Sequence, residues 1–202
     1  MREHRGQTAV EISPALVTQL RKLARARTRQ RPISWLAAQR IAAKQGAMLA
    51  RVASEAGIPP EDLVTGLPHI QVKLDGELPV SGITFWDRDR GCWTIRVRAS
   101  DDAARRRFTI LHEFKHALDH PFSAVLYDPR YLQGAAQAEM AADAFANTAL
   151  MPSQLVRRLV QVDGLSIGRL AKRLHVSCDR AALRLSDLNL SEPITSPKGE
   201  HQ

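Results

Sequence analysis

The chain has 202 residues, the length of one ordinary domain with at most a small appended unit. Hydrophobic residues make up 44% of the sequence, which is enough for a folded core and argues against global disorder. No stretch approaches the roughly 20 consecutive apolar residues of a membrane helix, and no apolar run follows the N-terminus as in a signal peptide. The sequence therefore predicts a cytoplasmic protein that does not enter a membrane.

The formal net charge is +8, which could attract nucleic acid or an acidic protein. Because the basic residues are spread over several segments, a solvated surface is the simpler interpretation, and any nucleic-acid binding is expected to be weak. Cys92 and Cys178 lack the close spacing of a thiolate metal site, so we expect incidental thiols in a reducing compartment.

The N-terminal part of the chain predicts helices. Residues 1–33 are expected to form a polar tail and a short helix that starts at Ser13-Pro14, a capping residue followed by proline at the first helical position. A second helix starts at Ser34 and continues with apolar residues at helical spacing until Gly57-Ile58-Pro59-Pro60 stops it. A third, short helix is expected over residues 61–65.

The pattern then changes to strands. Residues 70–74, 83–86 and 93–98 are rich in β-branched and aromatic residues, and the first of them alternates apolar with polar side chains. Residues 87–91 (DRDRG) between the last two have the composition of a hairpin turn. A small antiparallel sheet of about three strands is the natural interpretation.

The remaining chain predicts helices again. Ser100-Asp101 can cap a helix over about residues 102–120, which a loop over residues 121–134 connects to a second helix over about 135–151. Two or three short helices are expected over 153–190, followed by a disordered tail over 191–202. The predicted class is α+β and mostly helical.

The segment His112-Glu113-Phe114-Lys115-His116 has the form HExxH inside the first of these long helices. Residues i and i+4 share a helix face, so both imidazoles can reach one metal ion. Glu113 would lie beside the open coordination position, where a general base is useful. A hydrolytic zinc site usually has three protein ligands, so the chain must supply one more.

Glu139, Asp143 and Asn147 recur every four residues in the next helix, which is otherwise rich in alanine. An acidic stripe on such an apolar helix is costly unless it is paired or binds a metal. An HExxH motif followed at this spacing by ExxxD is typical of gluzincin metallopeptidases, in which the glutamate is the third ligand and the aspartate orients a ligand histidine. The alternative is an ordinary helix ion pair at Glu139.

Further candidates are weaker, and a surface or packing role is the alternative for each. His120 lies about 6 Å along the helix axis from His116, too far to join the same ion, and could contact substrate. Asp119 could stabilise the helix end or pair with an arginine. Tyr127, Arg130 and Tyr131 lie between the two metal helices and could donate a hydrogen bond to an oxyanion or contact substrate.

Together these residues resemble the ImmA/IrrE family of metallo-endopeptidases, whose pattern is RRFTLAHELGHxLLH followed by ExEADxFAxxLLMP. The resemblance covers about residues 35–190, and it is carried by residues 106–120 (RRFTILHEFKHALDH), 139–146 (EMAADAFA) and 150–152 (LMP). One departure is Lys115, where the family commonly has glycine. Position 115 should point away from the ligand face, so we expect little effect on metal binding.

The resemblance implies a zincin-like metallopeptidase core over residues 34–152 with a C-terminal helical segment, 153–190, packed on it. It implies a cytoplasmic zinc endopeptidase with one Zn²⁺ per chain. His112, His116 and Glu139 would be the ligands, Glu113 the catalytic residue and Asp143 the residue that orients a ligand. Such enzymes cleave a helix-turn-helix repressor of the Xre type and so derepress genes of mobile elements or stress responses.

The competing hypothesis is a DNA-binding regulator whose metal site is structural or sensory. Residues 165–188 resemble a helix-turn-helix, with Ala171 near the turn and Ser177 as cap of a recognition helix. Arg180 and Arg184 would then point outward. A packing or substrate-docking role for these helices is the alternative.

Overall fold

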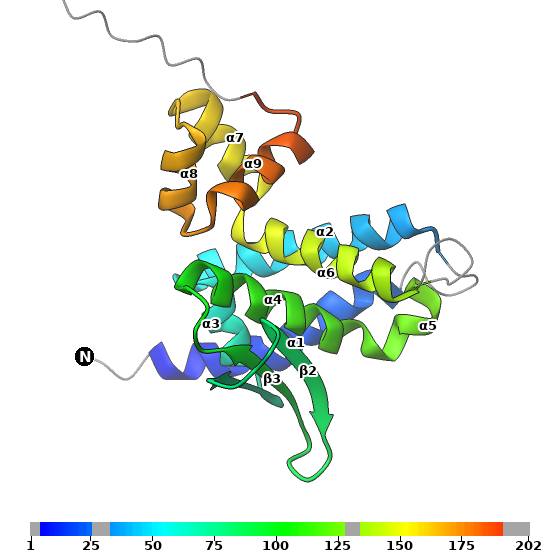
Figure 1. Ribbon diagram of the computed structural model, residues 1–202. Helices are drawn as coiled ribbons and strands as arrows, with labels where there is room; N and C mark the ends of the chain where they lie inside the picture. The colour runs from blue at the N-terminus through cyan, green and yellow to red at the C-terminus, as the bar shows by residue number, and fades with distance from the viewer. Residues whose placement is uncertain (1–4, 26–32, 128–133, 192–202) are drawn as a thin grey trace, which may run out of the picture. The chain divides into compact units, whose positions relative to one another are not determined.

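The computed structural model describes residues 5–25, 33–127 and 134–191 (Figure 1). The predicted class is confirmed, because the described chain is mostly helical with one small sheet. It divides into two compact units, Met1–Leu150 and Met151–Gln202. None of the described helices is both long enough and apolar enough to cross a bilayer. The predicted tail over 191–202 lies, except for its first residue, outside the described residues.

Three helices open the first unit: α1 (Arg5–Arg25), α2 (Trp35–Ala56) and α3 (Pro60–Thr65). The predicted limits of α2 are confirmed, since the Ser34 side chain accepts a hydrogen bond from the backbone N–H of Ala37 and Gly57 ends the helix in the left-handed conformation. The predicted start at Ser13-Pro14 is wrong. Helix α1 begins at Arg5, so Pro14 lies inside it and removes one backbone hydrogen bond without ending it.

The three strands are β1 (Ile70–Asp75), β2 (Gly82–Asp87) and β3 (Cys92–Arg98), in the order β1-β3-β2. Strand β2 pairs with β3 antiparallel, but β1 pairs with β3 parallel, so the sheet is mixed and the expectation of a purely antiparallel sheet is wrong. Ile95 and Val97 of β3 are fully buried, whereas the edge strands are mostly half-buried. The most buried strand thus takes the centre of the sheet.

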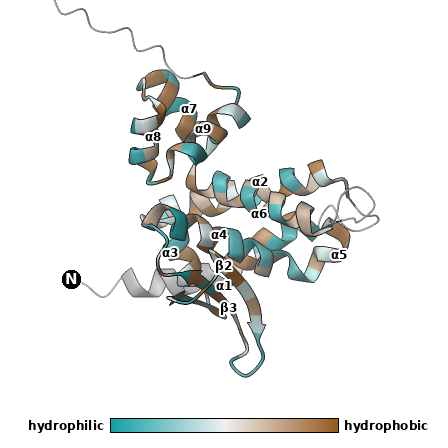
Figure 2. Cartoon of the chain, in the orientation of Figure 1, coloured by the Kyte–Doolittle hydropathy of each residue, from teal (hydrophilic) through white to brown (hydrophobic). Residues whose placement is uncertain are grey.

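The hairpin between β2 and β3 projects past the helices, and its tip is hydrophilic (Figures 1 and 2). The tip contains Gly91 in the left-handed conformation, which a side chain would make costly. The predicted turn over residues 87–91 is therefore confirmed.

Helix α4 (Ala103–Asp119) packs against α6 (Gly134–Leu150) and against strands β2 and β3. Its cap is Asp102, whose carboxylate accepts from the N–H of Arg105 at 2.8 Å, one residue beyond the predicted Ser100-Asp101. Two arginines anchor its first turns: Arg106 donates to the carbonyls of Ala99 and Asp101, and Arg107 forms an ion pair with Glu61 of α3.

The segment between α4 and α6 is not only a loop. It contains a 3₁₀ turn, η1 (His120–Phe122), and a single helical turn, α5 (Ser123–Leu126).

Helices α2 and α6 lie against each other at close range. Gly46 of α2 makes this possible, because a Cβ there would overlap the carbonyl oxygen of Phe145 and lie 3.1 Å from the nitrogen of Ala149. Gln45, fully buried, donates to the carbonyl of Leu20 at 2.9 Å and ties α2 to α1. Helix α6 is thus held from two sides, by α2 and by α4.

The second unit consists of α7 (Ser153–Arg157), a π-helical turn η2 (Arg158–Val162), α8 (Ile167–Leu174) and α9 (Cys178–Asp187). Ser177 caps α9 as predicted, accepting from the N–H of Arg180. Arg184 does not point outward: only 7% of it is exposed, and its guanidinium donates to the carbonyl of Met151 and the hydroxyl of Ser153. Arg180 is half-buried.

Candidate metal centre

Helices α4 and α6 bring His112, His116 and Glu139 together. The Nε2 atom of His112 lies 3.2 Å from Nε2 of His116 and 3.0 Å from Oε2 of Glu139. The Nε2 atom of His116 lies 3.3 Å from Oε1 of Glu139. The three side chains predicted as ligands therefore converge on one point, and they form a group that could hold a metal ion.

The spacing and the donor types fit zinc. Ligand atoms that sit roughly 2.0–2.1 Å from a tetrahedral ion lie about 3.3–3.4 Å apart, close to the separations found here. Two imidazole nitrogens and one carboxylate oxygen are the ligands that hydrolytic zinc sites use, and they leave one coordination position without a protein ligand. Calcium or magnesium, which prefer oxygen ligands, fit this set poorly.

Asp143, one turn after Glu139 on α6, lies behind His112. Its carboxylate accepts a hydrogen bond from Nδ1 of His112 at 2.9 Å, which places the ring proton on Nδ1 and directs the lone pair of Nε2 toward the convergence point. Burial alone would lower the pKa of His112, but the hydrogen bond and charge of Asp143, with the charges of Glu139 and Glu113, raise it. Burial and the neighbouring His112 lower the pKa of His116.

Glu113 lies on the same helix, and only 9% of it is exposed. Burial, together with the charge of Glu139, outweighs the effect of His112 and raises the pKa of Glu113 to about 7. Its side chain rests against Gly82 at the start of β2, where a Cβ atom would lie 2.9 Å from Cγ and 3.0 Å from Oε1 of Glu113. The sheet therefore fixes one side of this carboxylate.

Glu113, His116 and Glu139 face a cleft of about 470 Å³. Its other described lining residues are Gly82, Ile83, Thr84, Trp93, Asp119, His120, Ser123, Tyr127 and Ala138. His120 and Tyr127 line the cleft but are not among the converging ligands, and their contacts with substrate stay a prediction. Arg130 and Tyr131 lie outside the described residues. The strand residues were missed because no sequence pattern links them to HExxH.

The family model of peptidase M78, the IrrE N-terminal-like domain, matches residues 72–186. The chain belongs to this family. The match runs from within β1 to within α9 and includes all the residues of the candidate metal centre. The resemblance inferred from the HExxH and ExxxD blocks is confirmed.

Other comparisons add little. No curated protein matches the chain. A solved structure of a Mycobacterium tuberculosis transcriptional regulator is similar with a TM-score of 0.47 and 18% identity, over 90% of this chain and 53% of that one. This chain therefore spans about half the length of that regulator.

Lys115 and Asp119 are two buried charged residues of α4. Lys115 is 1% exposed and Asp119 is 2% exposed, and the two form an ion pair one turn apart on α4. Asp119 thus forms its ion pair with a lysine of its own helix, at the spacing i, i+4, and its charge also acts on Arg21. Lys115 is not among the residues that line the cleft.

The hydroxyl of Tyr127 also donates to Asp119, on the same Oδ2 atom that Lys115 contacts. Burial and the charge of Asp119 raise the pKa of Tyr127, so its hydroxyl keeps its proton. Because that single proton is already donated to Asp119, Tyr127 is not free to donate to an oxyanion in this arrangement.

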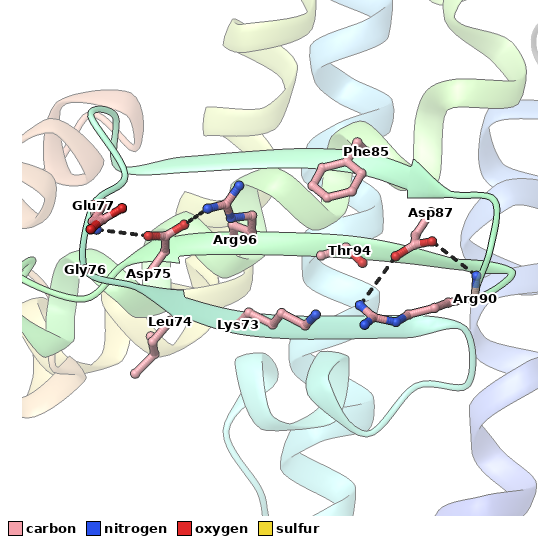
Figure 3. Close-up of a pocket in the computed structure, with 10 residues that line it drawn as sticks. All are labelled: Lys73, Leu74, Asp75, Gly76, Glu77, Phe85, Asp87, Arg90, Thr94 and Arg96. Carbon is pink, nitrogen blue, oxygen red and sulfur yellow. Dashed lines mark hydrogen bonds and ion pairs between the residues drawn. The ribbon is translucent and has the colours of Figure 1, made fainter.

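A second hollow, of about 560 Å³, lies on the outer face of the sheet (Figure 3). Its charged groups neutralise one another: Arg96 pairs with Asp75, and Arg90 lies 3.5 Å from Asp87. Asp75 also accepts from the N–H of Glu77, and this hydrogen bond contributes most to lowering its pKa. The hollow offers no convergence of ligand atoms comparable to that between α4 and α6.

Proposed function

We propose that this member of the peptidase M78 family is a zinc-dependent endopeptidase with its active site between α4 and α6. The observation that carries the proposal is the convergence of three ligand atoms within 3.3 Å of one another, with Glu113 at the same cleft. A group of three ligand atoms or a single buried glutamate can occur by chance in a helical protein. A metal site with a general base beside it is what amide hydrolysis needs.

In this proposal His112, His116 and Glu139 hold one zinc ion. A zinc ion held by these residues would supply a water molecule with a pKa lowered toward about 7 and a Lewis acid for the carbonyl of the scissile amide. Glu113 accepts the proton of the attacking water and returns it to the leaving amine nitrogen. Asp143 keeps the His112 ring in one tautomer and one orientation. Gly82 lets the backbone of β2 approach Glu113 closely enough to hold its carboxylate still.

We further propose a protein substrate, a helix-turn-helix repressor of the Xre type in the cytoplasm, whose cleavage derepresses genes. This substrate class comes from the family resemblance. The open cleft supports it only in a general way, since the cleft offers room for an extended peptide segment.

The first test uses purified protein with one equivalent of zinc and a random-sequence peptide library. We expect cleavage of peptide bonds by the wild type, detected by mass spectrometry. Glu113→Gln should retain zinc by elemental analysis and keep its circular dichroism spectrum, but lose about a hundredfold or more in rate. Cleavage that is unchanged in Glu113→Gln would exclude the proposed mechanism.

The substrate is tested by co-expression. A small helix-turn-helix protein encoded beside this gene should be shortened by the wild type and remain intact with Glu113→Gln. An intact neighbour protein, together with peptide cleavage by the wild type, would leave the enzyme assigned and reject this substrate.

The two arginines predicted to contact DNA do not support the DNA-binding hypothesis. Arg184 is buried in intramolecular hydrogen bonds and Arg180 is half-buried. The exposed residues of α9 include Asp179, Leu183 and Asp187, which suit a phosphate backbone poorly. We expect weak, salt-sensitive binding at most. Tight specific binding in a gel-shift assay at moderate salt would reverse this view.

A further inference from the structure

One buried oxygen at the cleft has no partner. The Oδ2 atom of Asp119 accepts from both Lys115 and Tyr127, whereas its Oδ1 atom is buried and has no hydrogen-bond partner among the described residues. Lys115 does not line the cleft, so it approaches Asp119 from the protein interior. Asp119 itself lines the cleft, so a donor within the cleft can complete the carboxylate. Leaving such an oxygen unpaired is costly, which gives a matching donor an advantage over a group that cannot donate.

The surroundings of this oxygen favour a cation. Three carboxylates, Glu113, Asp119 and Glu139, are among the lining residues of the cleft, and the described lining includes no lysine or arginine. Lys115 already offsets the charge of Asp119 from outside the cleft lining, so the cleft attracts a cationic side chain through its carboxylate oxygens and not through a large excess of negative charge.

Aromatic rings and a second unpaired atom lie in the same lining. The rings of Trp93 and His120 meet edge to face, with centroids 5.0 Å apart, and aromatic faces attract ammonium and guanidinium groups. The Oγ1 atom of Thr84 is also buried without a partner in the described part of the chain. Two unpaired acceptors beside aromatic walls suit a planar guanidinium, which carries five N–H donors.

We propose that Asp119 selects substrates with an arginine or lysine side chain close to the scissile bond, a specificity that rests on the proposed peptidase function. Asp119 accepts the cationic side chain through Oδ1, Thr84 accepts a second N–H, and Trp93 and His120 flank the group.

The test profiles cleavage of a random-sequence peptide library by the zinc-loaded wild type. We expect arginine and lysine to be enriched at one position within two residues of the cleaved bond. A peptide from that profile is then compared with its citrulline and norleucine analogues at the same position. The value of kcat/KM should fall roughly tenfold or more for norleucine, which has neither charge nor donor, and should also fall for the uncharged citrulline.

Variants assign the preference to residues. Lys115→Met/Asp119→Leu removes the buried pair together, and the ratio of arginine to norleucine cleavage should approach one. Thr84→Val, which keeps the side-chain shape, should lower the same ratio by a smaller factor. Thr94→Val is the matched control, because Thr94 Oγ1 is equally buried and unpaired but lines the hollow on the outer face of the sheet (Figure 3); its ratio should not change.

The outcomes separate this inference from the proposed function. Cleavage with no preference for basic residues, or a preference that survives Lys115→Met/Asp119→Leu in a folded protein, overturns the role of Asp119. If the wild type cleaves no peptide, the peptidase function fails. Asp119 is then tested by peptide binding to Glu113→Gln, measured by the quenching of Trp fluorescence. The Kd for the arginine peptide should be roughly tenfold lower than the Kd for the norleucine peptide. Equal affinities for the two peptides reject the inference.

Discussion

At the scale of single residues, the candidate site depends on the Glu113 side chain and on the room that Gly82 leaves for it. Glu113 is placed by HExxH on the correct helix, but its position against the sheet depends on Gly82, where even one methyl group would overlap Thr109 Cγ2 and press on Glu113. Sequence patterns could identify Glu113. They could not identify Gly82, because its importance comes from a contact between residues far apart in the chain.

Gly82→Ala should therefore displace Glu113 without removing a ligand. We expect kcat to fall about tenfold to a hundredfold, since small misplacements of a reacting group have effects of this size, while the zinc content stays at one per chain. Gly76→Ala is the control, because a Cβ at Gly76 meets no atom within 4 Å. Steady-state kinetics with elemental analysis checks both. Loss of zinc in Gly82→Ala would mean that the strand supports the metal ligands instead.

The buried pair of Lys115 and Asp119 makes a prediction about stability. Burial lowers the pKa of Lys115, although the charge and hydrogen bond of Asp119 oppose this. Lys115→Met or Asp119→Leu alone leaves one charged group buried without its partner, which typically costs about 3–5 kcal/mol. The double variant should cost less than either single variant, with a coupling of about 2 kcal/mol or more from urea unfolding. Additive losses would show that the two charges do not depend on each other.

At the scale of elements, the long helices were predictable and the sheet was only partly so. The start of α2 at Ser34 and its end at Gly57 follow from local capping chemistry, which the sequence displays directly. The insertion of β3 between β1 and β2 does not, because it depends on which strand buries most apolar surface in the assembled fold. Alternation reveals that strands exist, but not which of them become neighbours.

The same distinction holds at the start of α1 and at α9. Pro14 is a local signal for a helix start, yet α1 begins at Arg5. Arg184 is a charged residue whose exposure was assumed, yet it is buried because carbonyl and hydroxyl acceptors of Met151 and Ser153 satisfy it. In both cases the wider fold overrode a local rule.

Helix α6 carries the ligand Glu139 and its neighbour Asp143, so its contribution can be tested at Asp143. Asp143→Asn keeps the shape but weakens the hydrogen bond from His112 Nδ1, which lies 2.9 Å away. We expect a fall of about tenfold to a hundredfold in zinc affinity, measured by chelator competition. Asn147→Ala, one turn further along α6, is the control and should keep the affinity. An unchanged affinity in Asp143→Asn would limit Asp143 to a packing role.

At the scale of the whole molecule, the metal centre lies entirely within the unit Met1–Leu150. All three ligand atoms come from two helices that the rest of that unit holds together, so binding a metal should stabilise the folded chain by mass action. Among the described residues of the second unit, none belongs to the group of converging ligands.

Zinc should therefore raise the melting temperature of the full chain. Free zinc at 100 times Kd stabilises a folded protein by about 2.7 kcal/mol, which corresponds to roughly 5–10 °C for a unit of this size. Magnesium should produce no comparable rise, because the ligand set contains two imidazoles.

Glu139→Ala should abolish most of the zinc shift while leaving the metal-free melting temperature nearly unchanged, since 63% of the Glu139 side chain is exposed. His175→Asn, at an exposed histidine of the second unit, should keep the full shift. A zinc shift that survives Glu139→Ala but disappears in His175→Asn would place the stabilising ion in the second unit and remove the basis for a His-His-Glu centre.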